Sequence, residues 1–326
     1  MAIIVSVTMY QRPRYTDVLK AKKRIAPYLN KTPLLEYPGL SKALGFQAYV
    51  KHENMQPTGA FKIRGGINLI SQLSLEERSR GVVTASSGNH GQSIALASQM
   101  FGVKATICVP SDVNPDKAEA IKGFGAKIIA KGRDFDDARL NAERIAEEKE
   151  LRYVHSANEP LLIAGVGTVA LEILEDLPEF DAIIVPVGAG SQAAGVSLVM
   201  KNAAPNVEII AVQAENAPSA YLSWKSGNLE STESADTMAD GLATRSSFEL
   251  TQGIIRDNLD DFVLVSEEEM KNAIRLYVEK AHIIAEGAGA APLAAAYKLR
   301  GRLKGKKVVL VLSGGNLTAD MLRSIL

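Results

Sequence analysis

The sequence predicts an α/β protein in which helices cover mostly parallel sheets. Short runs rich in β-branched residues alternate with longer amphipathic stretches along most of the chain. Strands that are separated by helices pair in parallel, and helices then bury both faces of the sheet. The chain contains no heptads, no repeat of fixed period and no low-complexity tract. Coiled-coil and solenoid folds are therefore not indicated.

Each predicted element follows from its local pattern. The strand-like runs lie at 46–53, 81–89, 104–110, 126–132, 182–190, 207–215 and 307–315. Several helix-like stretches open on Asp, Asn or Ser, which cap free N–H groups, and two close on Gly. These stretches lie at 93–102, 114–125, 136–150 and 266–281.

Length and charge narrow the functional classes. The 326 residues suffice for two domains, each with its own core. The 37 Lys and Arg residues balance the 37 Asp and Glu residues, so no field of one sign attracts nucleic acid or an anionic membrane. We therefore expect neither of these partners.

The cysteine content and the N-terminal segment bear on location. Cys108 is the single cysteine, which excludes an internal disulfide and a thiolate metal site and fits a reducing setting. Residues 1–14 resemble neither a signal peptide nor a membrane span, because they lack a basic region, a cleavage site and sufficient length. We expect a cytoplasmic protein without a targeting segment.

Three glycine-rich turns follow strand-like runs, at 86–92, 188–191 and 313–316. Ligands bind at such strand ends in parallel sheets. The turn from Gly188 to Ser191 would leave backbone N–H groups bare at the start of a helix, whose dipole adds positive potential. This turn predicts a phosphate site. The structural alternative is a tight strand-to-helix turn that needs Gly only for its dihedral angles.

Nucleotide-binding motifs do not match these turns. The Gly-Lys-Ser/Thr sequence of a Walker loop is absent. A dinucleotide fingerprint needs a third glycine that the 188–191 turn lacks at the required spacing. Glu208 and Glu215 lie at distances that keep a dehydrogenase as an alternative.

Lys62 is the candidate nucleophile. It lies among small and apolar residues just after a Pro-Thr-Gly turn, where a helix is expected to begin. Near a helix N-terminus and partly desolvated, an ammonium group loses its proton more readily, and the free amine forms a Schiff base with an aldehyde. The alternative is a surface lysine whose stem packs on apolar neighbours.

Six segments, taken together, favour the interpretation of Lys62 as a Schiff-base lysine. They are QPTGAFKIRGG (56–66), TASSGNHGQSIA (84–95), IAGVGTVALEI (163–173), VPVGAGSQAAG (185–195), AEGAGAAPLAA (285–295) and VLSGGN (311–316). Their types and order resemble the fold-type II pyridoxal-phosphate enzymes of the threonine dehydratase and serine racemase family. The resemblance spans residues 20–320.

The resemblance implies a fold and an assembly. The fold would have two open, twisted, mostly parallel sheets flanked by helices, like that of tryptophan synthase β. A large domain that binds pyridoxal 5′-phosphate (PLP) would comprise residues 1–70 and 158–326, and a small mobile domain residues 71–157. The protein would be a homodimer. The sequence continues for only ten residues after Asn316, so we expect no C-terminal regulatory domain.

The resemblance also implies cofactor contacts. Lys62 would form the Schiff base with PLP, and Phe61 would lie beside it. Asn89 would bond the ring hydroxyl, Ser313 would face the pyridine nitrogen, and Glu286 would lie near the ring. The phosphate would be held by Gly188, Ala189, Gly190 and Ser191.

Substrate contacts are implied for the loop at 86–90. The carboxylate of an amino acid would bind there through hydroxyl, amide and helix N-terminal donors. The residues are Ser86, Ser87, Asn89 and His90. For His90, a role that only orders the loop is an equal alternative.

The implied reaction is elimination from a β-hydroxy amino acid. Lys62 would remove the Cα proton, and loss of the β-hydroxyl would lead to a 2-oxo acid and ammonia. A neutral Ser313 would not hold the ring nitrogen protonated, which favours prompt loss of the hydroxyl over a long-lived carbanion. The implied enzyme is an L-threonine or L-serine ammonia-lyase.

Serine racemase is the main alternative. Ser87 stands where serine racemases carry the acid or base of the second face, so it is a second candidate catalytic residue. Against this alternative, the stretch Asp136-Asp137-Ala138-Arg139 is closer to the dehydratase pattern than to that of the racemases.

Several residues depart from the family pattern. Val166 replaces a Gln, and Ala189 and Ser191 replace glycines. Gln213 and Ser219 stand where relatives carry carboxylate ligands of a divalent cation, so we expect no metal. The segment 243–248, which would approach the substrate side chain, also departs. A hydroxyaspartate or phenylserine substrate, or a PLP-binding protein without turnover, are further alternatives.

Overall fold

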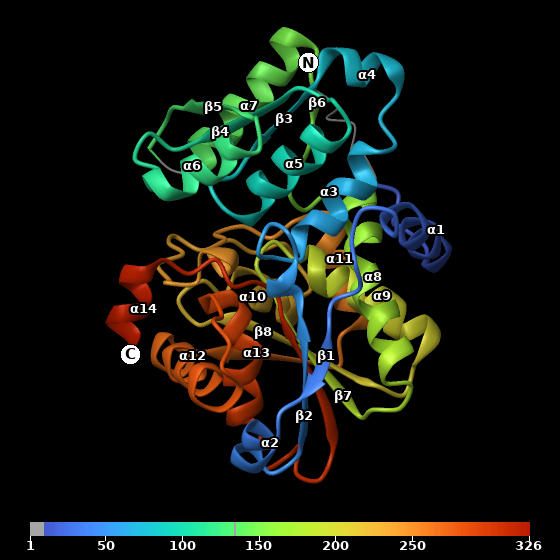
Figure 1. Ribbon diagram of the computed structural model, residues 1–326, viewed down its shortest axis with the longest axis vertical. Helices are drawn as coiled ribbons and strands as arrows, with labels where there is room; N and C mark the ends of the chain where they lie inside the picture. Colours follow the sequence, from blue (N-terminus) through green and yellow to red (C-terminus); the bar gives the residue numbers. More distant parts are fainter. Residues whose placement is uncertain (1–9, 134) are drawn as a thin grey trace.

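Two helix-flanked sheets organise the chain (Figure 1). The computed structural model describes residues 10–133 and 135–326. The predicted α/β class with two mostly parallel sheets is confirmed. Residues 1–9, on which the expectation about the N-terminal segment largely falls, lie outside the described residues.

The larger sheet has six strands in the order β1-β2-β10-β7-β8-β9. β1 runs antiparallel to β2, and the remaining pairs are parallel. Its strands come from two distant parts of the chain. They are β1 (Leu34–Glu36), β2 (Gln47–His52), β7 (Ala182–Pro186), β8 (Glu208–Ala214), β9 (Asp261–Val265) and β10 (Lys307–Leu312).

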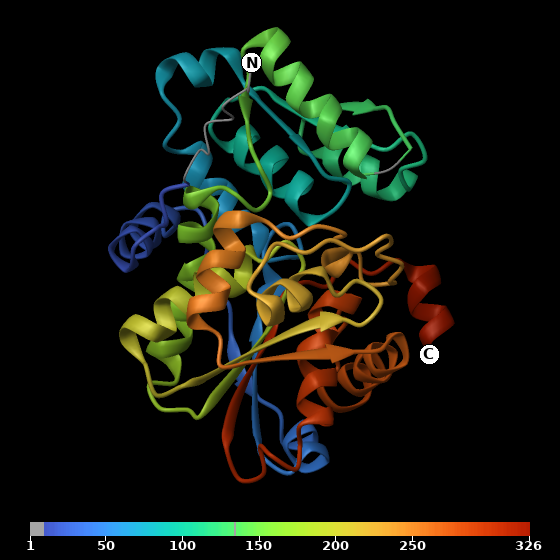
Figure 2. The same ribbon diagram turned by 180° about the vertical axis from the view of Figure 1, so that it is seen from behind.

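The smaller sheet has four parallel strands in the order β5-β4-β3-β6. With its helices it forms a separate layer above the larger sheet in both views (Figure 1 and Figure 2). All of its strands come from the middle of the chain. They are β3 (Val82–Ala85), β4 (Ala105–Val109), β5 (Lys127–Ala130) and β6 (Arg152–Tyr153).

The helices begin where side chains can cap them. Ser74 and Ser266 form capping boxes with the Glu three residues on, and Asn114 caps a helix that has Pro115 at its first position. The four predicted helical stretches are confirmed as α5, α6, α7 and α12. The helices are α1 (Tyr15–Ile25), α2 (Pro38–Leu44), α3 (Lys62–Ile70), α4 (Leu75–Arg80), α5 (Asn89–Met100), α6 (Pro115–Gly123), α7 (Phe135–Lys149), α8 (Pro160–Asp176), α9 (Ser191–Ala203), α10 (Ser219–Ser226), α11 (Glu249–Asn258), α12 (Glu267–Ala281), α13 (Gly287–Lys298), α14 (Ala319–Ile325) and the 3₁₀ helices η1 (Glu53–Met55) and η2 (Asp240–Leu242).

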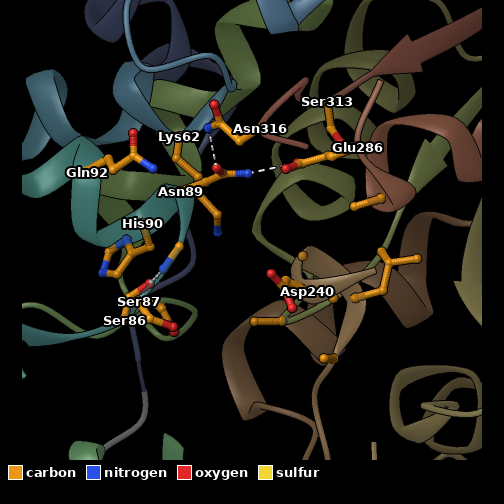
Figure 3. A pocket seen from close by; sticks show the side chains of 18 of the residues that line it. Lys62, Ser86, Ser87, Asn89, His90, Gln92, Asp240, Glu286, Ser313 and Asn316 are labelled. Carbon is orange, nitrogen blue, oxygen red and sulfur yellow. Dashed lines mark hydrogen bonds between the residues drawn. The ribbon is translucent and has the colours of Figure 1, made fainter. Parts of the chain in front are cut away.

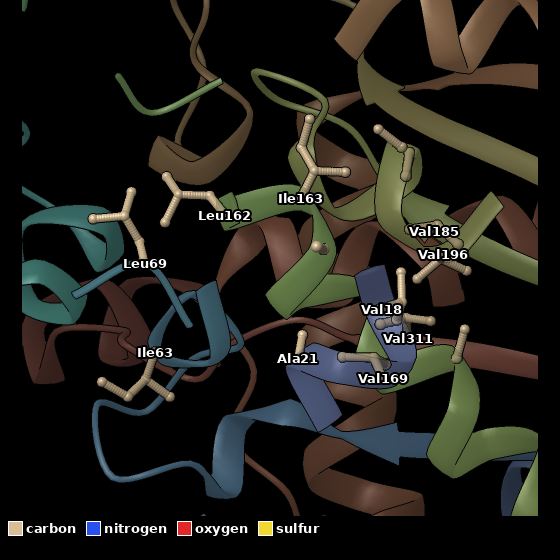
Figure 4. Close-up of a cluster of buried hydrophobic side chains, with 14 of the residues drawn as sticks. Val18, Ala21, Ile63, Leu69, Leu162, Ile163, Val169, Val185, Val196 and Val311 are labelled. Atoms are coloured by element: carbon tan, nitrogen blue, oxygen red, sulfur yellow. The ribbon is translucent and has the colours of Figure 1, made fainter. Parts of the chain in front are cut away.

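Alternating residues of β10 show that both faces of the larger sheet are buried. Val309 and Val311 pack into the cluster formed with α1, α3, α8 and α9 (Figure 4). Val308 and Leu310 belong to the cluster on the opposite face, with α12 and α13. This burial explains why β10 is a continuous apolar run.

Glycines let the helices near the site approach at backbone distance. A Cβ atom on Gly195 of α9 would lie 2.7 Å from the Gly167 nitrogen of α8. A Cβ atom on Gly165 would lie 2.6 Å from the Arg64 oxygen of α3. Side chains at these glycines would separate the three helices, so the glycines fix the starts of α3 and α9 relative to each other.

Three strands were absent from the sequence prediction. β1 and β6 are too short for a recognisable alternation, and they form only because a neighbouring strand pairs with them. β9 lies at a sheet edge with an irregular burial pattern, and its apolar run DFVLV was not distinguished from the flanking helices. None of the helices in the two described ranges combines the length and apolarity needed to cross a membrane.

Candidate active site

A cavity of about 510 Å³ opens between the two sheets, at the carboxyl ends of β3, β7 and β10. Its volume is in the range of sites for small organic ligands. The starts of α3, α5, α9 and α13 converge on it (Figure 3). Every residue that the sequence predicted for the site lines it: Phe61, Lys62, Ser86, Ser87, Asn89, His90, Gly188, Ala189, Gly190, Ser191, Glu286 and Ser313.

Lys62 is the first residue of α3, as the sequence predicted. Its Nζ donates a hydrogen bond of 2.8 Å to Ser191 Oγ and lies 5.1 Å from the centre of the Phe61 ring. Ser93 Oγ donates to the Lys62 carbonyl at 2.7 Å, which fixes the first turn of α3. Burial lowers the pKa of Lys62 from 10.5 to about 8. The cavity therefore holds an amine that is readily deprotonated.

Covalent attachment of an aldehyde should report this pKa. The neutral amine is the nucleophile, and its fraction rises as the pH rises through the pKa of about 8. We expect the rate at which PLP is attached to the apo-protein, measured by borohydride trapping, to rise with pH and to level off above about pH 8. If the rate of attachment kept rising until the pH reached the ordinary lysine pKa, the pKa of Lys62 would not be lowered.

The loop from Ser86 to His90 leads from β3 into α5. The Gly88 N–H donates to Ser86 Oγ at 3.2 Å, and α5 begins at Asn89. The N-terminus of α5 therefore faces the cavity together with the hydroxyl groups of Ser86 and Ser87. Free N–H groups and hydroxyls at a helix start suit a carboxylate ligand.

The His90 ring anchors this loop from behind. Thr84 Oγ1 donates to the Val154 carbonyl at 2.7 Å and lies 3.0 Å from His90 Nε2. The hydroxyl can therefore accept the proton on Nε2. Burial, together with the charge of Lys62, lowers the His90 pKa to about 3, so the imidazole is neutral. These contacts favour the ordering role of His90.

A chain of side-chain amides joins the two halves of the cavity. Asn89 Nδ2 donates to Glu286 Oε1 at 2.8 Å, and Asn316 Nδ2 donates to Asn89 Oδ1 at 2.7 Å (Figure 3). Burial raises the pKa of Glu286 to about 7, against the opposing bond from Asn89. Glu286 thus holds Asn89 in one orientation without carrying a full negative charge at neutral pH.

The turn between β7 and α9 fits an anion. Gly190 has a φ angle of +90°, and a Cβ on Gly188 would lie 2.1 Å from the Gly241 oxygen. Thr251 Oγ1 donates to the Ala189 carbonyl at 2.8 Å, so that oxygen is held by α11. The N–H groups and the dipole of the 13-residue helix α9 face the cavity. The turn thus offers an anion cradle of backbone donors at the start of a helix.

Ser313 directly follows β10 and lies on the far side of the cavity from His90 (Figure 3). It is 2% exposed, and its carbonyl accepts from the Phe61 N–H at 3.0 Å. That bond ties the strand end to the residue before Lys62. The hydroxyl is neutral over the ordinary pH range, so a ring nitrogen beside it would gain no carboxylate partner.

Several residues that line the cavity were not predicted from the sequence. Lys117 of α6 forms an ion pair with Asp240 of η2 across the mouth of the cavity. Asn316 lay within the motif VLSGGN but received no role. Gln192 follows the turn at 188–191 directly and was expected only to lie at the start of a helix. Asn316 and Gln192 are polar residues next to glycine turns, and this pattern could have indicated them. No local sequence pattern indicates that Lys117 pairs with Asp240.

Behind α3 lies a buried cluster of charges. The Arg64 guanidinium donates to both oxygens of Glu53, at 2.7 and 2.8 Å, and to both oxygens of Glu172, at 2.6 and 2.8 Å. Lys51 Nζ donates to Glu172 at 2.6 Å, and Thr32 Oγ1 donates to Glu53 at 2.6 Å. Two cations and two anions cancel, and the cluster joins β2, η1, α3 and α8.

Comparison with known proteins agrees with this site. The family described as "Pyridoxal-phosphate dependent enzyme" matches residues 25–314. An L-threonine ammonia-lyase of Thermotoga maritima is 43% identical over 310 residues, which cover 95% of this chain and 77% of that protein. A catabolic L-threonine dehydratase of Staphylococcus aureus is 40% identical over 306 residues, covering 92% and 88%.

Solved structures are also similar. Maize serine racemase has a TM-score of 0.92 at 33% identity, with 96% of this chain and 97% of that chain covered. The processed form of threonine deaminase isoform 2 from Solanum lycopersicum has a TM-score of 0.91 at 34% identity, covering 95% and 91%. The fold and the lysine-centred cavity therefore define an enzyme of the PLP-dependent class. The chain belongs to the pyridoxal-phosphate-dependent enzyme family, and its cofactor is PLP.

Proposed function

We propose that the protein is a PLP-dependent ammonia-lyase that acts on L-threonine or L-serine. The observation that carries this proposal is one cavity that holds the partly buried amine of Lys62, the glycine turn at 188–191 and the hydroxyl-bearing loop at 86–90. The names of relatives that share 40 to 43% of its residues support the same reaction.

The residues of the site have separate roles in this proposal. PLP, when bound, supplies a ring that accepts electrons from Cα. Lys62 would hold the aldehyde of the cofactor until the amino group of the substrate takes its place. The freed amine of Lys62 would then accept the Cα proton, which its low pKa suits. Ser86, Ser87 and Asn89 hold the substrate carboxylate at the start of α5, and Glu286 orients Asn89. The β-hydroxyl leaves as water, and a later water molecule releases ammonia and the 2-oxo acid.

Release of 2-oxo acid by the PLP-loaded protein tests the proposal. L-Threonine, L-serine, D-serine, threo-3-hydroxyaspartate and phenylserine would be compared under the same conditions. We expect 2-oxobutanoate from threonine or pyruvate from serine as the fastest products. Faster release from hydroxyaspartate or phenylserine would identify that compound as the substrate instead. If no compound gave a 2-oxo acid while PLP is bound, the protein would bind PLP without lyase activity.

Serine racemase is a second candidate, because Ser87 lines the cavity and the maize serine racemase structure is similar over most of the chain. In that case Ser87 would exchange the Cα proton on the face opposite Lys62. We expect Ser87→Ala to abolish D-serine formation, measured by chiral chromatography, while 2-oxo acid release persists. Equal loss of both reactions would mean that Ser87 serves only to bind the carboxylate.

We propose that no divalent cation binds at Gln213 and Ser219. Gln213 Oε1 accepts from the Tyr221 N–H at 3.0 Å, and Ser219 Oγ donates to the Thr244 carbonyl at 2.8 Å. Both side chains are neutral and fully buried, whereas Mg²⁺ and Ca²⁺ favour carboxylate oxygens. Turnover should therefore be the same after EDTA treatment as with added Mg²⁺, and a rate restored only by Mg²⁺ would contradict this.

We further propose that residues 71–157 form a small domain that closes on a large domain of residues 1–70 and 158–326. The ion pair between Lys117 and Asp240 supports closure, because it links α6 beside the smaller sheet to η2 across the cavity mouth. Closure would exclude water from the reacting atoms. The family resemblance supports a homodimer, and the single cysteine supports a cytoplasmic location.

A further inference from the structure

Gln192 is a buried amide without a partner at the edge of the cavity. Its side chain is 2% exposed, and neither Nε2 nor Oε1 makes a hydrogen bond with any residue of the described ranges. A buried amide that bonds to nothing costs free energy, so such groups are rare in native structures. Gln192 lines the same cavity as the anion cradle, which suggests that its partner is a ligand.

The position of Gln192 in α9 directs it toward the cradle. It is the second residue of the helix, directly after the turn at 188–191. Side chains in a helix lean toward the N-terminus, so a long side chain at this position reaches back over the first turn. The free N–H groups of the cradle lie at that end. The Gln192 amide and the backbone donors thus lie at the same end of α9.

Lys62 lies beside this space. Its Nζ is bonded to Ser191 Oγ, on the residue next to Gln192. When Lys62 forms its bond to the cofactor, its Nζ would give up the bond to Ser191 Oγ. We infer that the Gln192 amide then reaches the anion held at 188–191.

We propose that the Gln192 side chain donates a hydrogen bond to the phosphate of the cofactor. The cradle would then combine backbone N–H groups with a side-chain amide. A primary amide is neutral and offers two N–H groups, and a hydrogen bond to a charged oxygen is stronger than one between neutral groups. This inference rests on PLP binding alone, so it stands even where the substrate of the enzyme proves to be another amino acid.

Comparison of PLP with pyridoxal tests this proposal by equilibrium binding to the apo-protein. Pyridoxal carries the same ring and aldehyde but no phosphate. We expect Gln192→Leu to raise the Kd for PLP by about 10- to 100-fold and to leave the Kd for pyridoxal unchanged. If the substitution raised the Kd for both ligands by the same factor, or raised neither Kd, the proposal would be wrong.

Thermal unfolding gives a second readout that separates binding from folding. Leu at position 192 removes the unpaired amide, so the apo-protein should unfold at the same or a higher temperature than the wild type. The increase in Tm on adding PLP should shrink. A lower Tm of the apo-protein would mean that Gln192 is bonded inside the protein, and it would also overturn the proposal.

Gln92→Leu is the matched control. Gln92 is also a buried glutamine that lines the cavity, but it lies on α5, among the residues around Lys62 and His90 (Figure 3). We expect its replacement to leave the ratio of the two dissociation constants unchanged. A shift of that ratio as large as in Gln192→Leu would show that any lost amide has this effect, which contradicts a specific role of Gln192.

Discussion

Lys62→Ala is expected to abolish both covalent attachment of PLP and release of 2-oxo acid. Lys62 provides the amine of the described cavity whose pKa is lowered by desolvation, and Ala offers neither a nucleophile nor a base. Loss of a general base alone costs about 10²- to 10⁴-fold in rate, and loss of cofactor attachment adds to this. Borohydride trapping followed by mass spectrometry, and the absorbance of bound PLP, measure the first effect directly.

The stability of this variant separates chemistry from folding. Lys62 is partly buried with Ser191 Oγ as the hydrogen-bond partner of its Nζ, and desolvation disfavours the charged amine. Truncation to Ala removes a desolvated ammonium group, so the unfolding temperature of the apo-protein should not fall by much. A folded protein without attached cofactor is the expected combination. Wild-type turnover by Lys62→Ala would refute the assignment of Lys62.

Lys117→Ala is the control for charge in the same cavity. Lys117 also lines the cavity, but its ammonium group is paired with Asp240 at the mouth. PLP should still be attached to the protein after this substitution, because Lys62 is intact. Loss of attachment in Lys117→Ala would mean that the overall positive charge, and not one nucleophile, decides cofactor binding.

Local sequence patterns predicted those parts of the site whose residues are neighbours in the chain. Lys62 begins a helix after a Pro-Thr-Gly turn, and the cradle at 188–191 joins a buried strand to a helix, so both environments follow from short-range rules. The same holds for the seven strands that the sequence predicts. These features depend on residues within about one turn or one strand of each other.

Contacts between distant segments could not be derived in this way. Asn89 and Glu286 are 197 positions apart, and their bond forms because α5 and α13 both begin at the same cavity. The pair of Lys117 and Asp240 is 123 positions apart. No periodicity encodes such pairs, since they follow from the order of strands in two sheets, which the sequence analysis did not predict. Only family resemblance brought Asn89 and Glu286 to one site.

Arg64→Met is expected to destabilise the protein strongly. The guanidinium is 1% exposed and bonds to both oxygens of Glu53 and of Glu172. Burial opposes its charge, but the two carboxylates outweigh burial and raise the Arg64 pKa. Without Arg64, two buried carboxylates share the single cation of Lys51. Breaking a buried ion pair in this way costs about 3 to 5 kcal/mol of unfolding free energy, a large part of the usual total of about 5 to 15 kcal/mol.

The same substitution should also weaken PLP binding. Arg64 lies two positions after Lys62 in the first turn of α3, and its bonds to η1 and α8 hold that turn in place. Chemical denaturation of the apo-protein measures the stability, and titration with PLP measures the affinity. Arg323→Met is the control, because the Arg323 pair with Asp320 is exposed on the last helix and such pairs contribute little.

A second substitution shows whether charge imbalance is the cause. In Arg64→Met with Glu53→Gln, one buried cation and one buried anion remain, Lys51 and Glu172, which bond to each other at 2.6 Å. Neutrality is restored, so the double variant should be more stable than Arg64→Met alone, although each substitution by itself removes hydrogen bonds. If Glu53→Gln instead lowered the stability further by its full separate effect, the cluster would act through packing and independent bonds. The rise in stability on adding a second change therefore distinguishes a neutral ionic cluster from a set of separate contacts behind the catalytic helix.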